Sequence, residues 1–265
     1  MGETIIRAEN LSFSYESEEE KIPVIENLNL EIEKGSFVAV LGHNGSGKST
    51  LLRLLAGLEK QTSGEILIDG KPFSGPSLSR GVVFQDYGLF PWMTAGENIM
   101  LALRQRFPER DKKELREVAV NMLQSVGLDK GVYNKLPKEL SGGMKQRCAI
   151  ARAFGIDPPI LLMDEPFGAL DAVTRARLQD MVLELWRKQE PKKTVFFVTH
   201  DVDEAILLST KIFVLGQSPS NVIFSCDIPS DGRPTRETQF DDPKFLNLRN
   251  TLIRYINQDV ASRIS

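Results

Sequence analysis

The chain has few of the residues that build secreted or metal-dependent folds, with two cysteines and two histidines among 265 residues. Cys148 and Cys226 are too few for a disulfide framework and lack the spacing of metal ligands, so we expect a reducing compartment. The formal net charge is only -3, which argues against a nucleic-acid-binding surface spread over the fold. This balance leaves room for a local basic patch, but we expect no nucleic-acid partner.

Long apolar runs are also missing. None approaches the roughly 18 residues that a helix needs to cross a bilayer. Residues 1–7 lack the basic and then apolar pattern of a secretory signal. Any role at a membrane is therefore expected to depend on a partner protein. The length of 265 residues suits one large α/β domain or a domain with a subdomain, and the apolar content of 41% is enough for a substantial core.

The most specific pattern is a glycine-rich stretch between the apolar run Phe37 to Leu41 and a helical pattern. It matches G-x-x-x-x-G-K-[ST], the phosphate-binding loop. Glycines let backbone N–H groups approach an anion, and the following helix directs its positive dipole end to the same place. We expect Lys48 to reach the β- and γ-phosphates and the Ser49 hydroxyl to hold Mg²⁺. The residues expected to bind the nucleotide here are Gly42, His43, Asn44, Gly45, Ser46, Gly47, Lys48, Ser49 and Thr50.

A second pattern is an apolar strand that ends in two acids. Ile160 to Met163 are apolar, and Asp164 and Glu165 follow. In open α/β sheets, ligands bind at the carboxyl ends of the strands. We expect Asp164 to complete the Mg²⁺ shell and Glu165 to polarise water beside the γ-phosphate.

A third pattern places Ser141 as a helix N-cap before Gly142 and Gly143, so that N–H groups at a helix start can contact phosphate. Considered alone, this run is better explained as an ordinary capped helix. Its place in a fixed order favours a binding role, because it follows the phosphate loop and precedes the acid pair and a strand that ends at His200.

This order of motifs resembles the ATP-binding subunit of an ABC transporter, over roughly residues 3–215. The resemblance implies ATP and Mg²⁺ as ligands and suggests a role for single residues. Tyr15 is similar to the aromatic residue that stacks on adenine. Gln85 is similar to the glutamine that senses Mg²⁺ and the attacking water. Glu165 resembles the catalytic glutamate, and His200 resembles the switch histidine at the γ-phosphate.

In this family two subunits pack head to tail. The resemblance implies that Ser141, Gly142 and Gly143 of one subunit cap the ATP that Lys48 of the other subunit holds. The second subunit is expected to be another copy of this chain or a homologous ATPase. Residues 169–171 resemble the loop that crosses to it, while the His43 ring is expected to be incidental.

The stretches 84–94 and 164–171 are similar to the ATPases of nitrate, sulfonate and taurine importers. This resemblance implies permease subunits that dock near Gln85 to Met93 and an extracytoplasmic solute-binding protein. It also implies a peripheral location on the cytoplasmic face of the cell membrane. An apolar cluster is explained either as core of a helical subdomain or as the docking groove, and consists of Tyr87, Leu89, Phe90, Trp92 and Met93.

The fold class predicted is α/β, with a P-loop NTPase core of mainly parallel sheet, an antiparallel β layer and an inserted helical subdomain. We expect the RecA-like core and β layer at 1–88 and 156–215, the subdomain at 89–155 and a short C-terminal extension at 216–265. Residue periodicity predicts strands at 11–15, 24–32, 64–70, 81–84, 160–163, 194–199 and 211–215. It predicts helices at 97–104, from 111, after 143, at 172–188 and at 244–258, and loops at 16–21 and 230–234.

Two other functions remain open. One is a soluble ABC ATPase that acts on ribosomes or DNA. Two features of such proteins disfavour it: translation-factor types usually carry two cassettes, and DNA-repair types insert long coiled coils. The acidic balance of the chain disfavours both. The other is a P-loop kinase, in which residues 140–143 would have no role and substitution of Ser141 would leave activity nearly unchanged.

Overall fold

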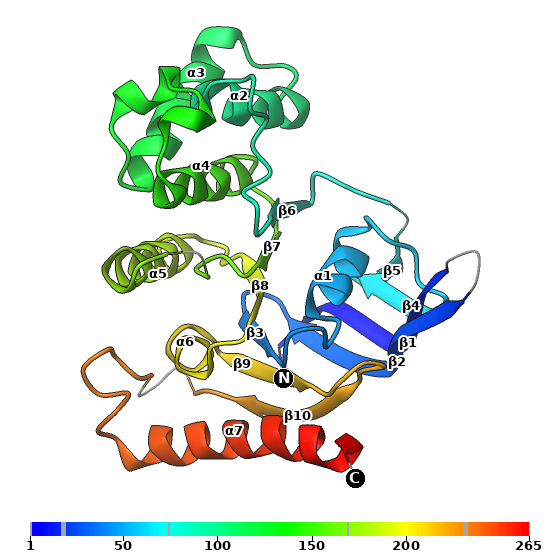
Figure 1. Cartoon of the computed structure of the whole chain (residues 1–265). Helices are drawn as coiled ribbons and strands as arrows, with labels where there is room; N and C mark the ends of the chain where they lie inside the picture. The colour runs from blue at the N-terminus through cyan, green and yellow to red at the C-terminus, as the bar shows by residue number, and fades with distance from the viewer. Residues whose placement is uncertain (1, 17–19, 74, 169, 230–232, 265) are drawn as a thin grey trace. The chain divides into compact units, whose positions relative to one another are not determined.

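A computed structural model describes residues 2–16, 20–73, 75–168, 170–229 and 233–264, with side chains up to residue 259. The chain forms two compact units (Figure 1). The first comprises Met1–Ser77 and Thr194–Ser265, and the second comprises Leu78–Lys193. The predicted boundaries of the helical subdomain at 89 and 155 lie inside the second unit, and they stay a prediction.

The first unit contains an antiparallel sheet with the strand order β2-β1-β4-β5. Apolar side chains that alternate along β1 and β2 are buried, as Leu11 and its partner Leu28 are, because one face of the sheet packs on the core. The predicted antiparallel layer is therefore confirmed. Its strands are β1 (Thr4–Glu16), β2 (Lys21–Glu33), β4 (Ser63–Ile68) and β5 (Lys71–Pro72). The predicted loop at 16–21 falls partly outside the described residues.

The first unit also contains the strands β10-β9-β3-β8 in that order, of which β9, β3 and β8 are parallel. Every residue of β3 is buried, as expected for a parallel strand covered on both faces. The strands are β3 (Phe37–Leu41), β8 (Thr194–Thr199), β9 (Lys211–Leu215) and β10 (Val222–Asp227).

Three helices belong to this unit: α1 (Lys48–Ala56), α6 (Val202–Leu208) and α7 (Pro243–Ile264). Three elements were not predicted: the short helix α6, the two-residue strand β5 and the strand β10, which pairs antiparallel with β9. The predicted terminal helix is confirmed and is longer than expected. The predicted turn at 230–234 falls partly outside the described residues.

The second unit combines two parallel strands with four α-helices, of which α2, α3 and α4 pack against one another (green in Figure 1). The predicted capping box of α3 is present, because Asp111 accepts from the Glu114 backbone N–H and the Glu114 side chain accepts from that of Asp111. The elements are β6 (Arg80–Val83), α2 (Ala95–Arg106), α3 (Lys112–Ser125), η1 (Lys130–Asn134), η2 (Pro137–Glu139), α4 (Gly142–Gly155), β7 (Ile160–Asp164) and α5 (Ala172–Arg187).

One helix boundary and one packing alternative need correction. The helix predicted after Gly143 begins at Gly142, so both glycines lie in its first turn. Core packing does not explain the whole aromatic cluster, because the Trp92 side chain is 72% exposed and Phe90 is 39% exposed. Among the described residues, no helix is both long and apolar enough to span a bilayer.

Candidate nucleotide-binding site

The glycine-rich stretch forms a loop between β3 and α1, as predicted. Gly47 is the N-cap of α1 with a φ of 80°, a left-handed conformation that favours glycine. No side chain caps this helix, and its first turn holds no acidic residue. The positive end of the helix dipole is therefore not neutralised by the side chains of its own first turn, which suits an anion.

Two side chains of the loop point inward. Lys48 is 5% exposed, and its Nζ donates to the carbonyl oxygens of Gly42 and His43 at 2.9 and 2.8 Å. The Ser46 hydroxyl is buried without a hydrogen-bond partner. A buried polar atom that lacks a partner is costly, so the loop favours a ligand that supplies one. His43, Asn44 and Gly45 are exposed along the open side of the loop.

Tyr15 lies near the end of β1 with 38% of its surface exposed. Its hydroxyl lies 3.3 Å from the Thr50 hydroxyl on α1, and its ring packs edge-on against Phe13 at 4.8 Å. The structure thus brings the predicted adenine-stacking residue beside the helix that follows the phosphate loop.

His200 leaves the sheet at the same edge as the phosphate loop. Thr199, the last residue of β8, pairs in register with Leu41, the last residue of β3. His200 and Gly42 follow directly, so the two loops start from neighbouring strand ends. The His200 side chain is exposed, and the adjacent Asp201 caps α6.

In the second unit, register brings Gln85 and Glu165 together. Val83 pairs with Met163 in parallel strands, and each site residue follows two positions later. The Gln85 Nε2 atom lies 3.5 Å from the Glu165 Oε2 atom. Asp164 is 6% exposed at the end of β7, and Glu165 adopts a φ of 42°, which is uncommon for a residue with a side chain.

At the start of α4, neighbouring side chains lie close to the backbone. The exposed Ser141 caps the helix by accepting from the Met144 backbone N–H at 3.3 Å. A Cβ atom on Gly142 would lie 3.1 Å from the Tyr87 hydroxyl, and one on Gly143 would lie 2.9 Å from Thr174 Cγ2. Only glycines leave these backbone positions uncrowded. Ala169, in the loop that resembles a subunit crossing, falls outside the described residues.

A buried arginine next to this site, Arg152, was not predicted. The Arg152 guanidinium on α4 donates to the carbonyl oxygens of Gly88 and Tyr87. Both of those residues have positive φ, 55° and 70°, in the turn that follows Gln85. Burial lowers the pKa of Arg152. An arginine within the apolar pattern of α4 is the only sequence signal, since its partners are 64 and 65 positions away.

The residues fit ATP and Mg²⁺ by their chemistry. The phosphate loop offers an uncapped helix start, a buried ammonium and an unpartnered hydroxyl. Ser49 and Asp164 carry oxygen donors, which Mg²⁺ prefers. No group of three or more His, Cys, Asp or Glu side chains among the described residues is arranged to hold a metal alone.

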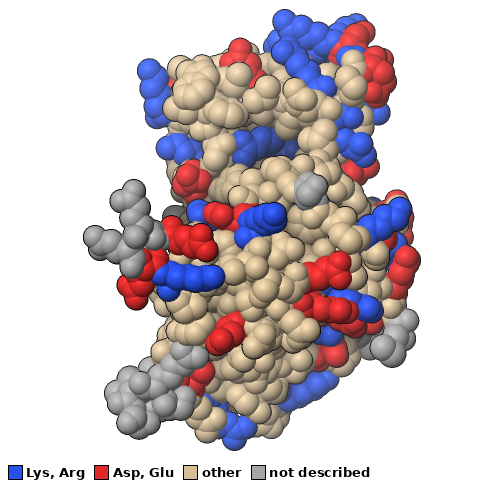
Figure 2. Space-filling view, turned by 90° about the vertical axis from the view of Figure 1, so that its right-hand side faces the viewer, with Lys and Arg blue, Asp and Glu red and all other residues tan. Residues whose placement is uncertain are grey.

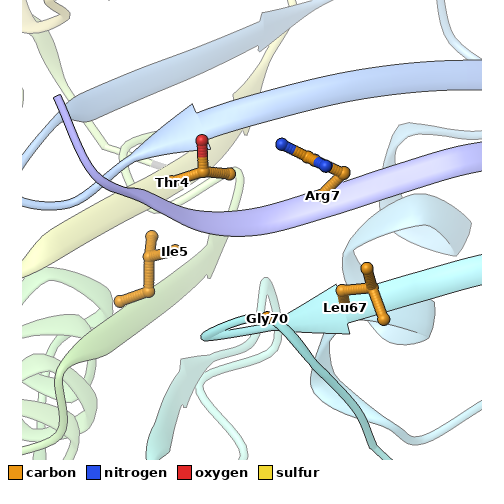
Figure 3. Close-up of a pocket in the computed structure, with 5 residues that line it drawn as sticks. All are labelled: Thr4, Ile5, Arg7, Leu67 and Gly70. Carbon is orange, nitrogen blue, oxygen red and sulfur yellow. The ribbon is translucent and has the colours of Figure 1, made fainter. Parts of the chain in front are cut away.

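A separate pocket of about 150 Å³ lies on the antiparallel sheet (Figure 3). Arg7 gives it a positive side chain, but the Nε atom of Arg7 already pairs with Glu31 at 2.7 Å. None of the predicted site residues lines the pocket. The lining residues are Thr4, Ile5, Arg7, Leu67 and Gly70.

Residues 25–168 match the family model described as ABC transporter. The nitrate import ATP-binding protein NrtD of Synechococcus elongatus is 43% identical over 238 residues, which cover 89% of this chain and 86% of the relative. An uncharacterized ABC transporter ATP-binding protein of Methanocaldococcus jannaschii is 43% identical over 262 residues, or 98% and 94% of the two chains. The bicarbonate transport ATP-binding protein CmpD of Synechococcus elongatus is 40% identical over 249 residues, or 94% and 88%.

Two solved structures share the fold. A dimeric ATP-binding cassette, MJ0796, in a post-hydrolysis state bound to ADP and Pi, superposes with a TM-score of 0.77 at 33% identity. That match covers 85% of this chain and 100% of the other. The cbiO1 protein of Clostridium perfringens, described as part of the ABC transporter complex cbiONQ, superposes with a TM-score of 0.74 at 27% identity. The match covers 94% of this chain and 99% of cbiO1.

Proposed function

Because the chain belongs to the ABC transporter family and is one of its ATP-hydrolysing subunits, we propose that it energises the import of a small anion through a membrane permease. The observation that carries this proposal is the 43% identity with a relative named for nitrate import, over 89% of this chain. A second relative is named for bicarbonate transport. Nitrate, sulfonate or taurine-like anions are accordingly the first solutes to test.

In the proposed reaction, Lys48 binds the β- and γ-phosphates of ATP and Tyr15 stacks on the adenine. Glu165 accepts a proton from the attacking water, Gln85 orients that water and His200 contacts the γ-phosphate. Ser49, Gln85 and Asp164 would hold Mg²⁺, which neutralises phosphate charge when bound. The 3.5 Å contact between Gln85 and Glu165 supports their joint action on one water.

The proposed assembly is a head-to-tail pair of ATPase subunits, either two copies of this chain or this chain with a homologue. Ser141, Gly142 and Gly143 of one subunit would bind the γ-phosphate held by the other. A helix start stabilises negative charge only while the charge is present, so hydrolysis and phosphate release would let the pair separate. The dimeric state of the ADP-bound relative supports this arrangement.

The proposed partners are permease subunits that dock near Gln85 to Met93 and an extracytoplasmic solute-binding protein. The exposed Trp92 and Phe90 rings, 5.4 Å apart, support a docking role because aromatic side chains are common interface anchors. Peripheral association with the cytoplasmic face of the membrane follows from such docking.

An ABC ATPase that acts on ribosomes or DNA is the alternative. It would need a basic surface for a polyanion, whereas acidic and basic side chains lie interspersed over the face in Figure 2. The net charge of -3 also favours a protein partner.

The experiment is affinity purification of the tagged chain from gently solubilised source membranes, with mass spectrometry of the proteins that accompany it. We expect a multi-spanning permease, and its solute can then be tested directly by uptake of nitrate, sulfonate or taurine. Recovery with ribosomes or DNA-bound proteins, and without a membrane protein, would overturn the transport proposal while leaving ATP hydrolysis in place.

A further inference from the structure

The segment Gly216–Ser220, which follows β9, lies against the phosphate loop; we call it the brace segment. A Cβ atom on Gly47 of the loop would lie 3.3 Å from the Ser220 hydroxyl and 3.0 Å from Val24 Cγ1. Ser220 is fully buried. Ser220 and Val24 of β2 therefore lie beside Gly47 of the phosphate loop and leave no room there for a side chain.

The far end of the brace segment is fastened to β2 by backbone hydrogen bonds. The Ser220 N–H donates to the Val24 carbonyl at 2.9 Å, and the Glu26 N–H donates to the Ser220 carbonyl at 3.0 Å. The Ser220 hydroxyl donates to the Val24 carbonyl at 3.2 Å. Ser220, which lies beside the phosphate loop, is thus hydrogen-bonded to β2 of the antiparallel sheet.

The near end of the brace segment is fastened by the C-terminal helix. The Asp259 carboxylate on α7 accepts from the Gln217 backbone N–H at 2.6 Å. A Cβ atom on Gly216 would lie 3.0 Å from Ile223 Cγ2 and 3.1 Å from Asp259 Oδ1, so the carboxylate lies close to the Gly216 backbone. A hydrogen bond to a charged acceptor is among the stronger ones in proteins.

Helix α7 packs against other elements of the first unit, so Asp259 has a defined position. Tyr255 stacks on Phe224 of β10 with ring centroids 4.4 Å apart. Arg249 pairs with Asp203 of α6 at 2.7 Å, and Leu252 is fully buried. Figure 1 shows α7 (red) lying along β10 (orange).

We infer that Asp259 is a positioning residue for nucleotide binding, which holds the brace segment against the phosphate loop from the C-terminal helix. The inference rests on the proposed binding of nucleotide phosphates at Lys48. An anion cradle of backbone N–H groups depends on how those groups are aimed, so a displaced brace weakens phosphate contacts without removing any of them.

The test is the Kd of ADP, measured on the full-length chain by titration with a fluorescent ADP analogue. ADP probes the phosphate loop and lacks the γ-phosphate that the proposed pairing of subunits requires. Asp259→Ala removes the acceptor and is expected to raise Kd about fivefold or more, the lower end of typical coupling between sites. Asp259→Asn keeps an acceptor oxygen and is expected to stay within about twofold of the wild type, by the same standard.

Asp129→Ala is the matched control, because it removes a carboxylate that accepts from the Gly131 backbone N–H at 2.7 Å, away from α7 and the brace segment. It is expected to lower the melting temperature and leave the Kd of ADP unchanged. If Asp259→Ala does not fold, Asp259→Glu keeps the charge and displaces the carboxylate from the Gln217 N–H by one methylene group, with the same expected rise in Kd.

Two outcomes separate this inference from the function on which it rests. If the wild-type chain binds no ADP, the nucleotide role of Lys48 and this inference fail together. If the wild type binds ADP, but Asp259→Ala or its substitute lowers only the melting temperature, Asp259 merely stabilises the fold and this inference alone fails.

Discussion

The side-chain amide of Gln85 lies 3.5 Å from the carboxylate of Glu165, at the ends of two strands that pair in parallel. Gln85 and Glu165 each follow the end of their strand, at the same edge of the sheet. This contact supports the proposed roles of Gln85 in orienting water and of Glu165 as general base.

Replacing Glu165 by glutamine keeps the size of the side chain and removes its basicity. We expect Glu165→Gln to bind ATP with an affinity close to that of the wild type and to hydrolyse it about 10²–10⁴-fold more slowly, the usual contribution of a general base. Steady-state phosphate release and equilibrium ATP binding measure the two effects. A variant that retains most of the wild-type rate would exclude Glu165 as the base.

Ser141→Ala tests whether Ser141 acts at a phosphate, as in an ABC cassette, or only caps α4. Loss of the cap on Met144 is expected to cost about 1 kcal/mol of stability, as N-cap losses do. Thr94→Ala removes the comparable cap of α2 and is the control for that loss. We expect only Ser141→Ala to lower ATPase activity of the assembled protein, and equal activities of the two variants would argue against a role at phosphate.

Trp92→Ala tests the proposed permease contact. Because the side chain is 72% exposed, we expect a stability change within about 0.5 kcal/mol, as at other surface positions, and unchanged ATP binding. Co-purification with the permease is expected to fall. Leu58→Ala, at another exposed apolar residue, is the control. Unfolding of the Trp92 variant, or undiminished assembly, would contradict a docking role.

Arg152→Lys tests whether α4 holds the turn after Gln85. Lysine cannot reproduce the planar fork that contacts two carbonyl oxygens, so we expect kcat to fall severalfold with little change in the KM for ATP. Arg106→Lys loses a similar bond, to the Ile156 carbonyl, away from Gln85. If both variants lose stability and keep kcat, Arg152 has only a structural role.

Thiol labelling tests the burial of both cysteines. Burial raises the pKa of Cys148 to about 12 and that of Cys226 to about 11. A raised pKa leaves less thiolate at a given pH, so alkylation by iodoacetamide at pH 8 is expected to be slower than in the unfolded chain, by about 100-fold for Cys226 and about 1000-fold for Cys148. The rate should increase as pH approaches these values. Fast labelling of the native protein at pH 8 would contradict this expectation.

Much of the fold follows from local patterns in the sequence. The phosphate loop, the buried parallel strands and the capped start of α3 depend on residues close to one another along the chain. The strand β10 was missed although Val222, Phe224 and Cys226 alternate with other residues, because it is a half-buried edge strand whose cover, α7, comes later in the sequence. Helix α6, with seven residues, is too short for its periodicity to be read.

The parts of the site that could be predicted are those whose functional residues lie within one short motif. The motif residues on each strand end could be named, but not the contacts that support them. Arg152 reaches the turn after Gln85 across 64 and 65 positions, and Asp259 reaches Gln217 across 42. Only the folded chain brings such pairs together, because the partners lie far apart in the sequence.

The contact between Asp259 and Gln217 also affects the end of the chain. Coupling free energy acts equally in both directions, so if α7 aids nucleotide binding, bound nucleotide must hold α7 in place by the same factor. Helix ends that detach are where proteases cut. A subunit with bound nucleotide would then be cleaved by proteases at α7 more slowly than an empty subunit. The supply of nucleotide in the cell would in this way influence the lifetime of the protein.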